Sequence, residues 1–411
     1  MYSEIFVNVR QGKVYVENFS VFHRAGTVAL LSNFFCIPPM SLFISIFAFV
    51  LLLTLLILIH EWGHFTAARK FGVVVEEFGF GLPPKIKTIF SQGGTRFTFN
   101  WIPFGGFVRL KGENAVTEKD RTAKGSFGAA PIHARVIILL AGVFMNLILA
   151  LCILTVGFTS GWIPTYLSYE DMQSAGEKGE IHVQFSVLID SVVGGSNAAI
   201  SGLPAKSIVR SIDGNNVVSP DDIAPLQEGK SQVTYTVSRI ENGKLLEEQE
   251  QYTVNLSDGK AGVVIVPYPL ELSAPKRGVG TAFLLATREA RIMTSQTIIG
   301  IGKLFTSLAS TGKVPEGISG IIGIAQLTHG AIQEGFTHYL RLVALLSLSL
   351  AVLNALPFPA LDGGRLLFVL AEWITRKPVN RTFELTTNAV GFVVLILLIV
   401  LITFNDIVHL F

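Results

Sequence analysis

Charge and cysteine are both scarce in this chain of 411 residues. Only 15% of the residues are charged, the formal net charge is +2, and the mean hydropathy is +0.53. The near-neutral balance argues against a dedicated nucleic-acid-binding protein, because such domains are strongly basic. The two cysteines, Cys36 and Cys152, lie in apolar segments and are too few for a disulfide framework or a thiolate zinc site. The composition indicates an integral membrane protein with a soluble part.

The sequence contains several long apolar runs without charged residues. A membrane-crossing helix needs about 20 apolar residues. Four segments meet this requirement: residues 41–66, 135–161, 338–356 and 388–404. The first run has no short apolar core followed by a cleavage site, so we expect an uncleaved first span rather than a signal peptide. Residues 1–40 form an N-terminal extension to which the sequence assigns no role.

Basic residues set the expected orientation. The loop after the first span is rich in lysine and arginine, whereas only Arg24 lies shortly before that span. The positive-inside rule places this loop in the cytoplasm. Both termini and residues 163–275 are then expected outside. A site at the end of the first span would lie toward the cytoplasmic side.

The sequence His60-Glu61-Trp62-Gly63-His64 closes the first apolar run. Ionisable groups at membrane depth are costly and are therefore candidates for function. Positions i and i+4 share one helix face, so His60 and His64 can bind one metal ion, and Glu61 can accept a proton from water activated there. A single buried histidine is usually a hydrogen-bonded core residue. Two histidines and a glutamate on one apolar helix favour a zinc protease.

A third zinc ligand is still needed, because catalytic zinc sites usually have three protein ligands. Asp362 is the candidate: Pro357 and Pro359 end the third span just before it, so the chain unwinds at this depth. Two alternatives remain open. Asp362 could instead cap the helix that follows it, or Glu76 or Glu77 could supply the third ligand.

The chain resembles a known family through several motifs in the family's order. These are HEWGHFTAARKFGV, FGFGLPPKI, NWIPFGGFVRLKGE, SGIIGIAQ, LNALPFPALDGGR and FNDI. Over residues 41–411 it is similar to the site-2 proteases, in particular the bacterial regulator of sigma-E protease type. The resemblance implies one Zn²⁺ on His60, His64 and Asp362, with Glu61 as the catalytic base. It also implies that Asn354 helps to hold the substrate or the oxyanion.

The same resemblance implies a location and a substrate class. We expect an enzyme of the bacterial inner membrane that cleaves single-pass transmembrane segments, either of anti-sigma factors or of remnant signal peptides. Its partners would then be these substrates and the lipid bilayer, with no nucleic acid.

Residues 86–102 are typical of a β-hairpin. Two strand-like runs flank Gly93-Gly94, and Phe97, Phe99 and Trp101 alternate onto one face. We expect this hairpin to associate with the membrane and to accept an unwound substrate as an added strand. The family resemblance agrees, because it implies a β-loop that dips into the membrane. The alternative is an ordinary surface hairpin.

Residues 183–267 predict a small β-rich domain, from runs such as QVTYTVSRI and AGVVIVP. The segment SVVGGSNAAISGLPAKSIVRSIDGNNV resembles a PDZ domain. It has no clear Gly-Φ-Gly-Φ loop for a peptide carboxylate, so a gate against bulky substrates is at least as reasonable as peptide binding. Residues 276–312 mix apolar residues with charges and predict an amphipathic helix at the membrane interface.

The predicted fold is a multi-span α-helical membrane protein with four transmembrane helices, a membrane-associated β-hairpin and one extracytoplasmic PDZ-like α+β domain. Its predicted parts are 1–40 (extension), 41–162 (first two spans, zinc motif and hairpin), 183–267 (PDZ-like domain), 276–312 (interfacial helix) and 336–411 (last two spans and the Leu-Asp-Gly motif). The predicted function is intramembrane zinc endopeptidase. One alternative is an inactive or metal-binding scaffold that captures clients through its PDZ domain. Another is a membrane metalloprotease with a glutamate as third ligand.

Overall fold

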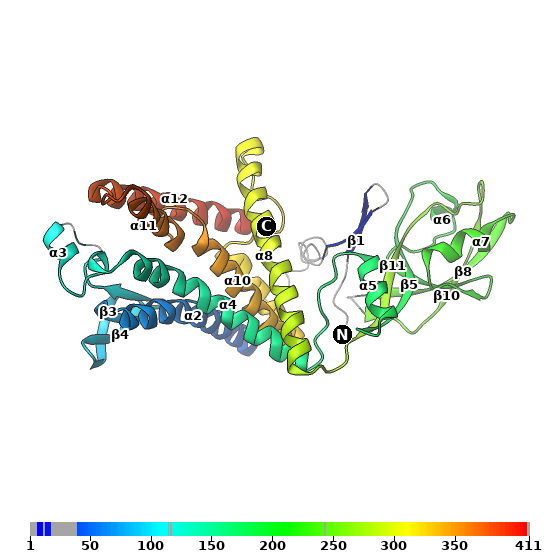
Figure 1. Cartoon of the computed structure of the whole chain (residues 1–411). Coiled ribbons are helices and arrows are strands. Elements are labelled where there is room, and N and C mark those ends of the chain that lie inside the picture. The colour runs from blue at the N-terminus through cyan, green and yellow to red at the C-terminus, as the bar shows by residue number, and fades with distance from the viewer. Residues whose placement is uncertain are drawn as a thin grey trace. The chain divides into compact units, whose positions relative to one another are not determined.

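The computed structural model describes residues 6–10, 13–17, 39–113, 115, 117–241 and 244–408. The chain divides into two compact units, which we name the helical unit (26–157 and 278–411) and the β unit (1–25 and 158–277) (Figure 1). Within the N-terminal extension, β1 (Phe6–Arg10) pairs with β2 (Lys13–Glu17) in antiparallel fashion.

Four helices are long and apolar enough to cross a membrane: α2 (Pro39–Lys70), α4 (Ile132–Thr159), α10 (Phe336–Ala355) and α12 (Arg381–Val408). Large apolar side chains on them point away from the protein, for example Phe47 on α2 and Phe392 on α12, which are 62% and 56% exposed. A soluble protein rarely exposes apolar surface on this scale, so these faces suit lipid. Each of the four predicted spans thus corresponds to a helix that is a candidate for crossing a membrane, with ends that differ by several residues.

One helix was not predicted from the sequence. It is α9 (Ile321–Glu334), which is too short to span a bilayer and contacts α2, α10 and α12. The N–H groups of Gly320 and Gly323 both donate to Asp406 Oδ2 on α12, at 2.9 Å each. A helix leaves its first amides without internal partners, and here the carboxylate supplies the acceptor. This contact gives a structural role to the FNDI motif.

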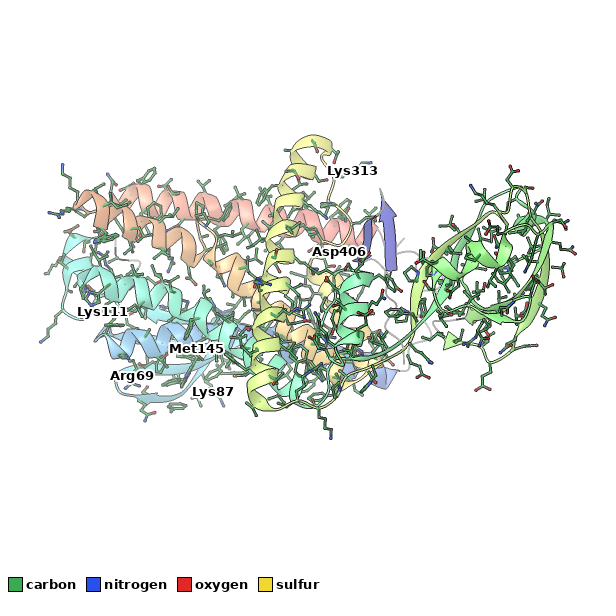
Figure 2. The ribbon with its side chains drawn as sticks, turned by 45° about the vertical axis from the view of Figure 1, so that its right-hand side comes forward. Arg69, Lys87, Lys111, Met145, Lys313 and Asp406 are labelled. Carbon is green, nitrogen blue, oxygen red and sulfur yellow. The ribbon has the colours of Figure 1, made fainter. Side chains whose placement is uncertain are left out.

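The predicted amphipathic segment corresponds to α8 (Val279–Thr311). Glu289 of α8 is 1% exposed and pairs with Arg341 of α10 at 3.3 Å. The helix therefore docks on α10 through a buried ion pair. Figure 2 shows Lys313, just after α8, and Asp406 far from Arg69 and Lys111, which lie toward the other end of the helical unit.

A β-ribbon of β3 (Val75–Gln92) and β4 (Thr95–Leu110) follows α2. Its turn lies at Gly93-Gly94, where the sequence predicts it, and both glycines have positive φ, 58° and 81°. The ribbon is wider than a simple hairpin, because Phe78 pairs with both Phe97 and Val108. The first half of β3 thus lies between the two halves of β4, while its second half pairs with β4 on one side only.

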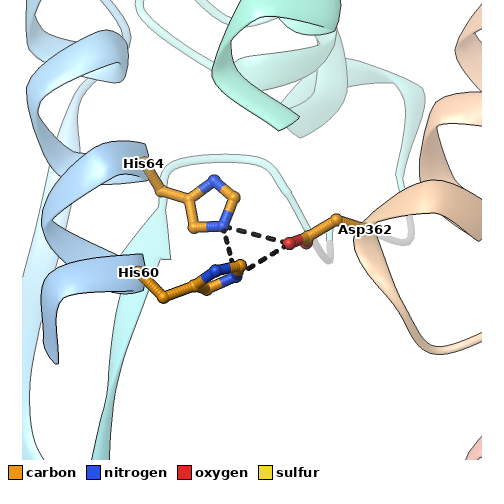
Figure 3. A group of neighbouring side chains, drawn as sticks. All are labelled: His60, His64 and Asp362. Carbon is orange, nitrogen blue, oxygen red and sulfur yellow. Dashed lines mark hydrogen bonds and ion pairs between the residues drawn. The ribbon is translucent and has the colours of Figure 1, made fainter. Parts of the chain in front are cut away.

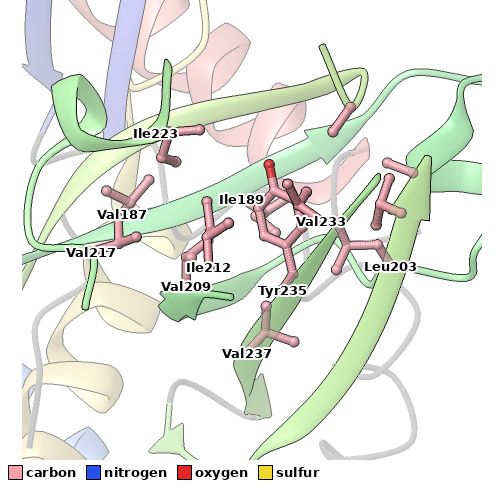
Figure 4. Close-up of a cluster of buried hydrophobic side chains, with 13 residues drawn as sticks. Val187, Ile189, Leu203, Val209, Ile212, Val217, Ile223, Val233, Tyr235 and Val237 are labelled. Carbon is pink, nitrogen blue, oxygen red and sulfur yellow. The ribbon is translucent and has the colours of Figure 1, made fainter. Parts of the chain in front are cut away.

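The β unit contains a sheet with strand order β10-β8-β6-β5-β11. Its strands are β5 (His182–Val192), β6 (Ser207–Ile212), β7 (Asn215–Asn216), β8 (Gln232–Glu241), β9 (Lys244–Leu245), β10 (Glu250–Asn255) and β11 (Val263–Ser273). Alternating apolar residues of these strands form a core around Ile189, Val209 and Tyr235 (Figure 4). The sheet begins and ends a few residues outside the predicted range 183–267.

Short helices complete the chain. They are α3 (Glu118–Thr122), η2 (Phe127–Ala129), α5 (Tyr169–Glu177), α6 (Asn197–Ile200), η3 (Pro220–Asp222), α7 (Ile223–Gln227) and α11 (Asp362–Thr375). In the β unit, Asp213-Gly214 and Asp258-Gly259 form tight turns in which all four residues have positive φ. Asp-Gly is a favoured pair for such two-residue turns.

Candidate metal centre

Three side chains that could together hold a metal ion converge in the helical unit from two distant segments (Figure 3). His60 and His64 project from one face of α2, and Asp362 is the first residue of α11. Asp362 Oδ2 lies 3.0 Å from His60 Nε2 and 3.2 Å from His64 Nε2, and the two Nε2 atoms are 3.1 Å apart. The histidines are only 6% and 8% exposed. The spacing predicted for a shared metal ion is therefore present.

The separations fit zinc. Two ligands of one tetrahedral zinc ion lie about 3.3 Å apart, given metal–ligand distances of about 2.0–2.1 Å. Two imidazole nitrogens and one carboxylate oxygen form a common catalytic donor set that leaves a fourth position open. The three side chains present thus suit Zn²⁺.

Hydrogen bonds on the far side of each imidazole orient the rings. His64 Nδ1 lies 2.8 Å from the carbonyl oxygen of Ile138, to which it can donate. That bond leaves the lone pair of His64 on Nε2, facing Asp362. His60 Nδ1 lies 3.4 Å from the side-chain amide of Asn146, a completely buried residue of α4. A lone asparagine in an otherwise apolar span is the signal in the sequence that could have identified this residue.

Two glycines let α4 approach the histidines closely. A Cβ atom on Gly63 would lie 2.3 Å from the carbonyl oxygen of Ala141. A Cβ atom on Gly142 would lie 2.5 Å from His64 Nε2 and 2.6 Å from His60 Cε1. Small residues at a helix contact permit such an approach within a membrane. Gly142 keeps the space between the two imidazoles and α4 open.

The chain places Asp362 by a tight reversal after α10. A Cβ atom on Gly363 would lie 2.2 Å from the carbonyl oxygen of Leu356, and one on Gly364 would lie 2.2 Å from that of Phe358. These two positions therefore require glycine, because the backbone of the preceding loop touches them. The N-cap of α11 is Leu361, with no side-chain cap. The alternative in which Asp362 caps this helix is thus wrong.

Ion pairs hold α11 in place. Arg365, one turn after Asp362, pairs with Glu113, the residue that follows the β4 ribbon by a short turn. Further along, both oxygens of Glu372 are used: Oε1 accepts from Arg121 at 2.8 Å and Oε2 from Arg135 at 2.5 Å. Buried ion pairs of this kind fix one arrangement of the helices, because losing one partner is strongly unfavourable.

Two further predicted site residues have free polar atoms. Glu61 is half-buried, and its carboxylate makes no hydrogen bond or ion pair with any described residue. Asn354 lies in the last turn of α10, half-buried, and its amide likewise has no partner in the described part of the chain. Both side chains can therefore accept a ligand without breaking a contact of their own.

The other candidate ligands lie elsewhere. Glu77 is 6% exposed, accepts a hydrogen bond from Thr98 Oγ1 at 2.9 Å and pairs with Arg109 at 3.2 Å. Glu76 and Glu77 belong to β3 and are not part of the group that His60, His64 and Asp362 form. The neighbouring arginine makes a buried carboxylate tolerable at this position.

The three aromatic residues predicted to share one face of the ribbon differ in burial. Phe97 is 7% exposed and packs against Phe65 of α2 and Phe90 of β3, whereas Phe99 and Trp101 are 43% and 69% exposed. Helix α2 covers this face of the ribbon at Phe97 and leaves it open at Phe99 and Trp101. Phe97 therefore belongs to the core, and Phe99 and Trp101 remain available to a membrane or a substrate.

Comparison with known proteins agrees with this geometry. The profile described as peptidase family M50 matches residues 48–398. A protein of Clostridium perfringens named as a zinc metalloprotease is 31% identical over 367 residues, which are 86% of this chain and 95% of that protein. A similarly named protein of Fusobacterium nucleatum is 30% identical, with 88% and 98% of the two chains covered. The zinc metalloprotease RasP of Bacillus licheniformis is 26% identical, with 89% and 99% covered. This chain therefore belongs to peptidase family M50 and is a zinc-dependent membrane protease of the site-2 type.

Proposed function

We propose that this protein is an intramembrane endopeptidase that cleaves single-pass transmembrane segments. Its substrates would be anti-sigma factors or remnant signal peptides. The observation that carries the proposal is the meeting of His60, His64 and Asp362 between helices long enough to cross a bilayer. A zinc site enclosed by such helices can reach a peptide bond that lies within the membrane.

The residues of the site divide the chemical work. Zn²⁺ bound by His60, His64 and Asp362 would supply a Lewis acid that activates water and polarises the scissile carbonyl. Glu61, next to His60 and free of other partners, accepts the proton from the attacking water and returns it to the leaving amine. Asn354 donates its amide N–H to the substrate backbone or to the developing oxyanion.

The outer strand of the ribbon is the proposed cradle for the substrate. A helical substrate must unwind before cleavage, and its freed backbone groups then need partners in the membrane. Residues 85–92 pair with β4 on one side only, so their other edge can add a strand. Ile86, Ile89 and Phe90 on this strand are each nearly half exposed, which suits an apolar surrounding.

The proposed location is the inner membrane of a bacterium, with the metal centre toward the cytoplasm. The position of Arg69 and Lys111 toward one end of the helical unit supports this orientation through the positive-inside rule. Both termini and the β unit would then be extracytoplasmic. For the β unit we propose a PDZ-like gate that excludes substrates with bulky outer domains.

Glu61→Gln tests the proposed chemistry. The full-length variant should keep stoichiometric zinc, because the three ligands are untouched, and should lose at least 100-fold in the rate of cleavage of a membrane-embedded model substrate. Zinc is measured by mass spectrometry of the purified protein, and cleavage by gel in proteoliposomes. Cleavage by the variant at the wild-type rate would reject Glu61 as the base. A wild-type protein that binds zinc but cleaves no membrane substrate would instead favour a client-capturing scaffold.

The natural substrate is sought by comparing membrane proteomes. Cells that carry Glu61→Gln should accumulate single-pass fragments that are absent from wild-type cells. If no membrane fragment differs between the two, the proposed substrate class is wrong.

A further inference from the structure

A separate pocket of about 620 Å³ lies between the first turn of α4 and the end of α11. It is lined by Ile132, Arg135, Glu372, Trp373, Ile374, Arg376, Lys377 and Pro378. None of these residues belongs to the metal centre. The ends of the two helices lie at the same end of the helical unit as α3 (Figure 1).

The pocket carries excess positive charge. Arg376 and Lys377 are exposed, and neither forms an ion pair with any described residue. The one acid in the wall, Glu372, is already shared by Arg121 and Arg135. The first turn of α4 has no acidic residue, so the positive end of this long helix is also uncompensated.

Arg135 gives an independent sign that an acceptor is missing. Its side chain is 8% exposed, and one guanidinium nitrogen donates to Glu372. Its Nε is buried and has no hydrogen-bond partner. Arg135 lines the pocket, and buried donors nearly always have acceptors, so Glu372 does not use the whole hydrogen-bonding capacity of this guanidinium.

The position of the pocket indicates which anion. The membrane-spanning helices α4 and α12 both start beside it, at Ile132 and Arg381, so it lies at the depth where hydrocarbon meets headgroups. Trp373 and Ile374 are 62% and 75% exposed directly next to the basic pair. Aromatic and apolar side chains beside lysine and arginine are typical of the membrane interface, where they contact acyl chains while the cations contact phosphate.

We propose that this pocket binds the phosphodiester headgroup of an anionic phospholipid. Arg376 and Lys377 contact the phosphate from the open side, and Arg135 from below. Trp373 and Ile374 receive the upper part of an acyl chain. The site tethers α11, which carries Asp362 at its other end, to the lipid surface.

The experiment uses the full-length protein in detergent, titrated with short-chain phosphatidylglycerol or phosphatidylcholine and followed by native mass spectrometry. The double variant Arg376→Gln/Lys377→Gln should bind phosphatidylglycerol about 10- to 30-fold more weakly than the wild type, since each basic residue near anionic lipid contributes appreciably. The matched control Lys119→Gln/Lys124→Gln removes the same charge from exposed positions outside the pocket and should bind as the wild type does.

Each other outcome has a meaning. Equal weakening in both double variants would show diffuse surface attraction and would overturn the proposal. Displacement of the lipid by an equal concentration of inorganic phosphate would assign the pocket to free phosphate instead. Trp373→Ala keeps every charge and should also weaken phosphatidylglycerol binding, so it provides a test if the double variant fails to fold. Unchanged binding in Trp373→Ala would exclude the acyl-chain contact.

Discussion

Asn146 shows how a buried side chain on one helix can set the tautomer of a metal ligand on a neighbouring helix. For His60 Nε2 to bind metal, its Nδ1 must carry the proton, and Asn146 is the polar side chain beside it at 3.4 Å. The atom of Asn146 nearest to His60 Nδ1 is Nδ2, and the buried Oδ1 has no partner. A 180° turn of the amide group places Oδ1 beside Nδ1, as the acceptor that this tautomer needs. The interaction links α4 to the donor set of α2.

Asn146→Leu should weaken zinc binding by about 10- to 100-fold, because an imidazole without its outer hydrogen bond is less well oriented and less basic. Asn146→Asp keeps an acceptor of the same shape and should retain most of the affinity. The measurement is competition for zinc with a chromophoric chelator. Equal affinities of the leucine variant and the wild type would show that Asn146 does not orient His60.

Gly142→Ala should remove zinc binding by steric means. The added Cβ would lie within 2.7 Å of atoms of both imidazoles, which are too buried to move aside without cost. The control is Gly300→Ala on α8, where an added Cβ meets nothing within 4 Å. Metal content of the two purified variants is compared. Full zinc occupancy in Gly142→Ala would mean that the helices separate more easily than this packing suggests.

The role of a residue is predicted best when it depends on neighbours that are close in the sequence. The i, i+4 spacing of His60 and His64 fixes their common face from the helix period alone. Pro357 and the glycines after Asp362 likewise mark the break that places the third ligand. The contact between Asn146 and His60 could not be predicted in this way, because the two residues are 86 positions apart and no local pattern encodes their contact.

At the scale of elements, contacts between segments far apart in the sequence determine features that the local residue pattern does not predict. Alternation along β4 predicts a common face for Phe97, Phe99 and Trp101. It cannot predict that α2 covers only one end of this face. Helix α9 was not predicted for a similar reason. It is short, and its first amides donate to a carboxylate of α12 that lies far along the chain.

The Asp213-Gly214 turn of the β unit provides a prediction for pH dependence. Lys230 donates to Asp213 Oδ2 at 2.9 Å, the amide of Thr234 donates to Oδ1 at 2.7 Å, and these bonds lower the pKa of Asp213. A lowered folded-state pKa stabilises the fold above the unfolded value of about 4, and this stabilisation is lost as the pH falls through the folded value.

Asp213→Asn should therefore weaken the protection of β6 and β8 from hydrogen exchange at pH 7, by at most about 1 kcal/mol because the pair is partly exposed. The difference from the wild type should begin to shrink below about pH 4 and should disappear once the pH has fallen through the lowered pKa of folded Asp213. Asp258→Asn is the control, since it changes the same residue in a turn with the same backbone conformation. A pH-independent difference would show that geometry rather than charge is responsible.

At the scale of the whole molecule, the part of the β unit that contains its main sheet can be removed at a natural junction. The chain enters and leaves it side by side: Arg277 donates to the carbonyl oxygens of Trp162 at 3.3 Å and of Glu180 at 2.5 Å. An added Cβ on Gly161 would lie 3.0 Å from the carbonyl oxygen of Ala274. A short glycine-serine linker can therefore replace residues 163–273.

This deletion should leave zinc binding intact and widen the range of membrane substrates that are cut, if the β unit acts as a gate. The assay compares model substrates with and without a folded outer domain. Loss of all cleavage with zinc retained would mean that the β unit takes part in catalysis or substrate capture instead.

Asp406 has a consequence for biosynthesis. It lies 83 positions after Gly323, whose amide it accepts, so the ribosome makes α9 well before the carboxylate that completes its first turn exists. During that interval the first turn of the nascent helix must either fray or donate its free N–H groups to water. Final assembly of the helices around the catalytic ion thus waits for nearly the last turn of α12 to emerge, and a protein truncated before that point would enter the bilayer with its interior unfinished.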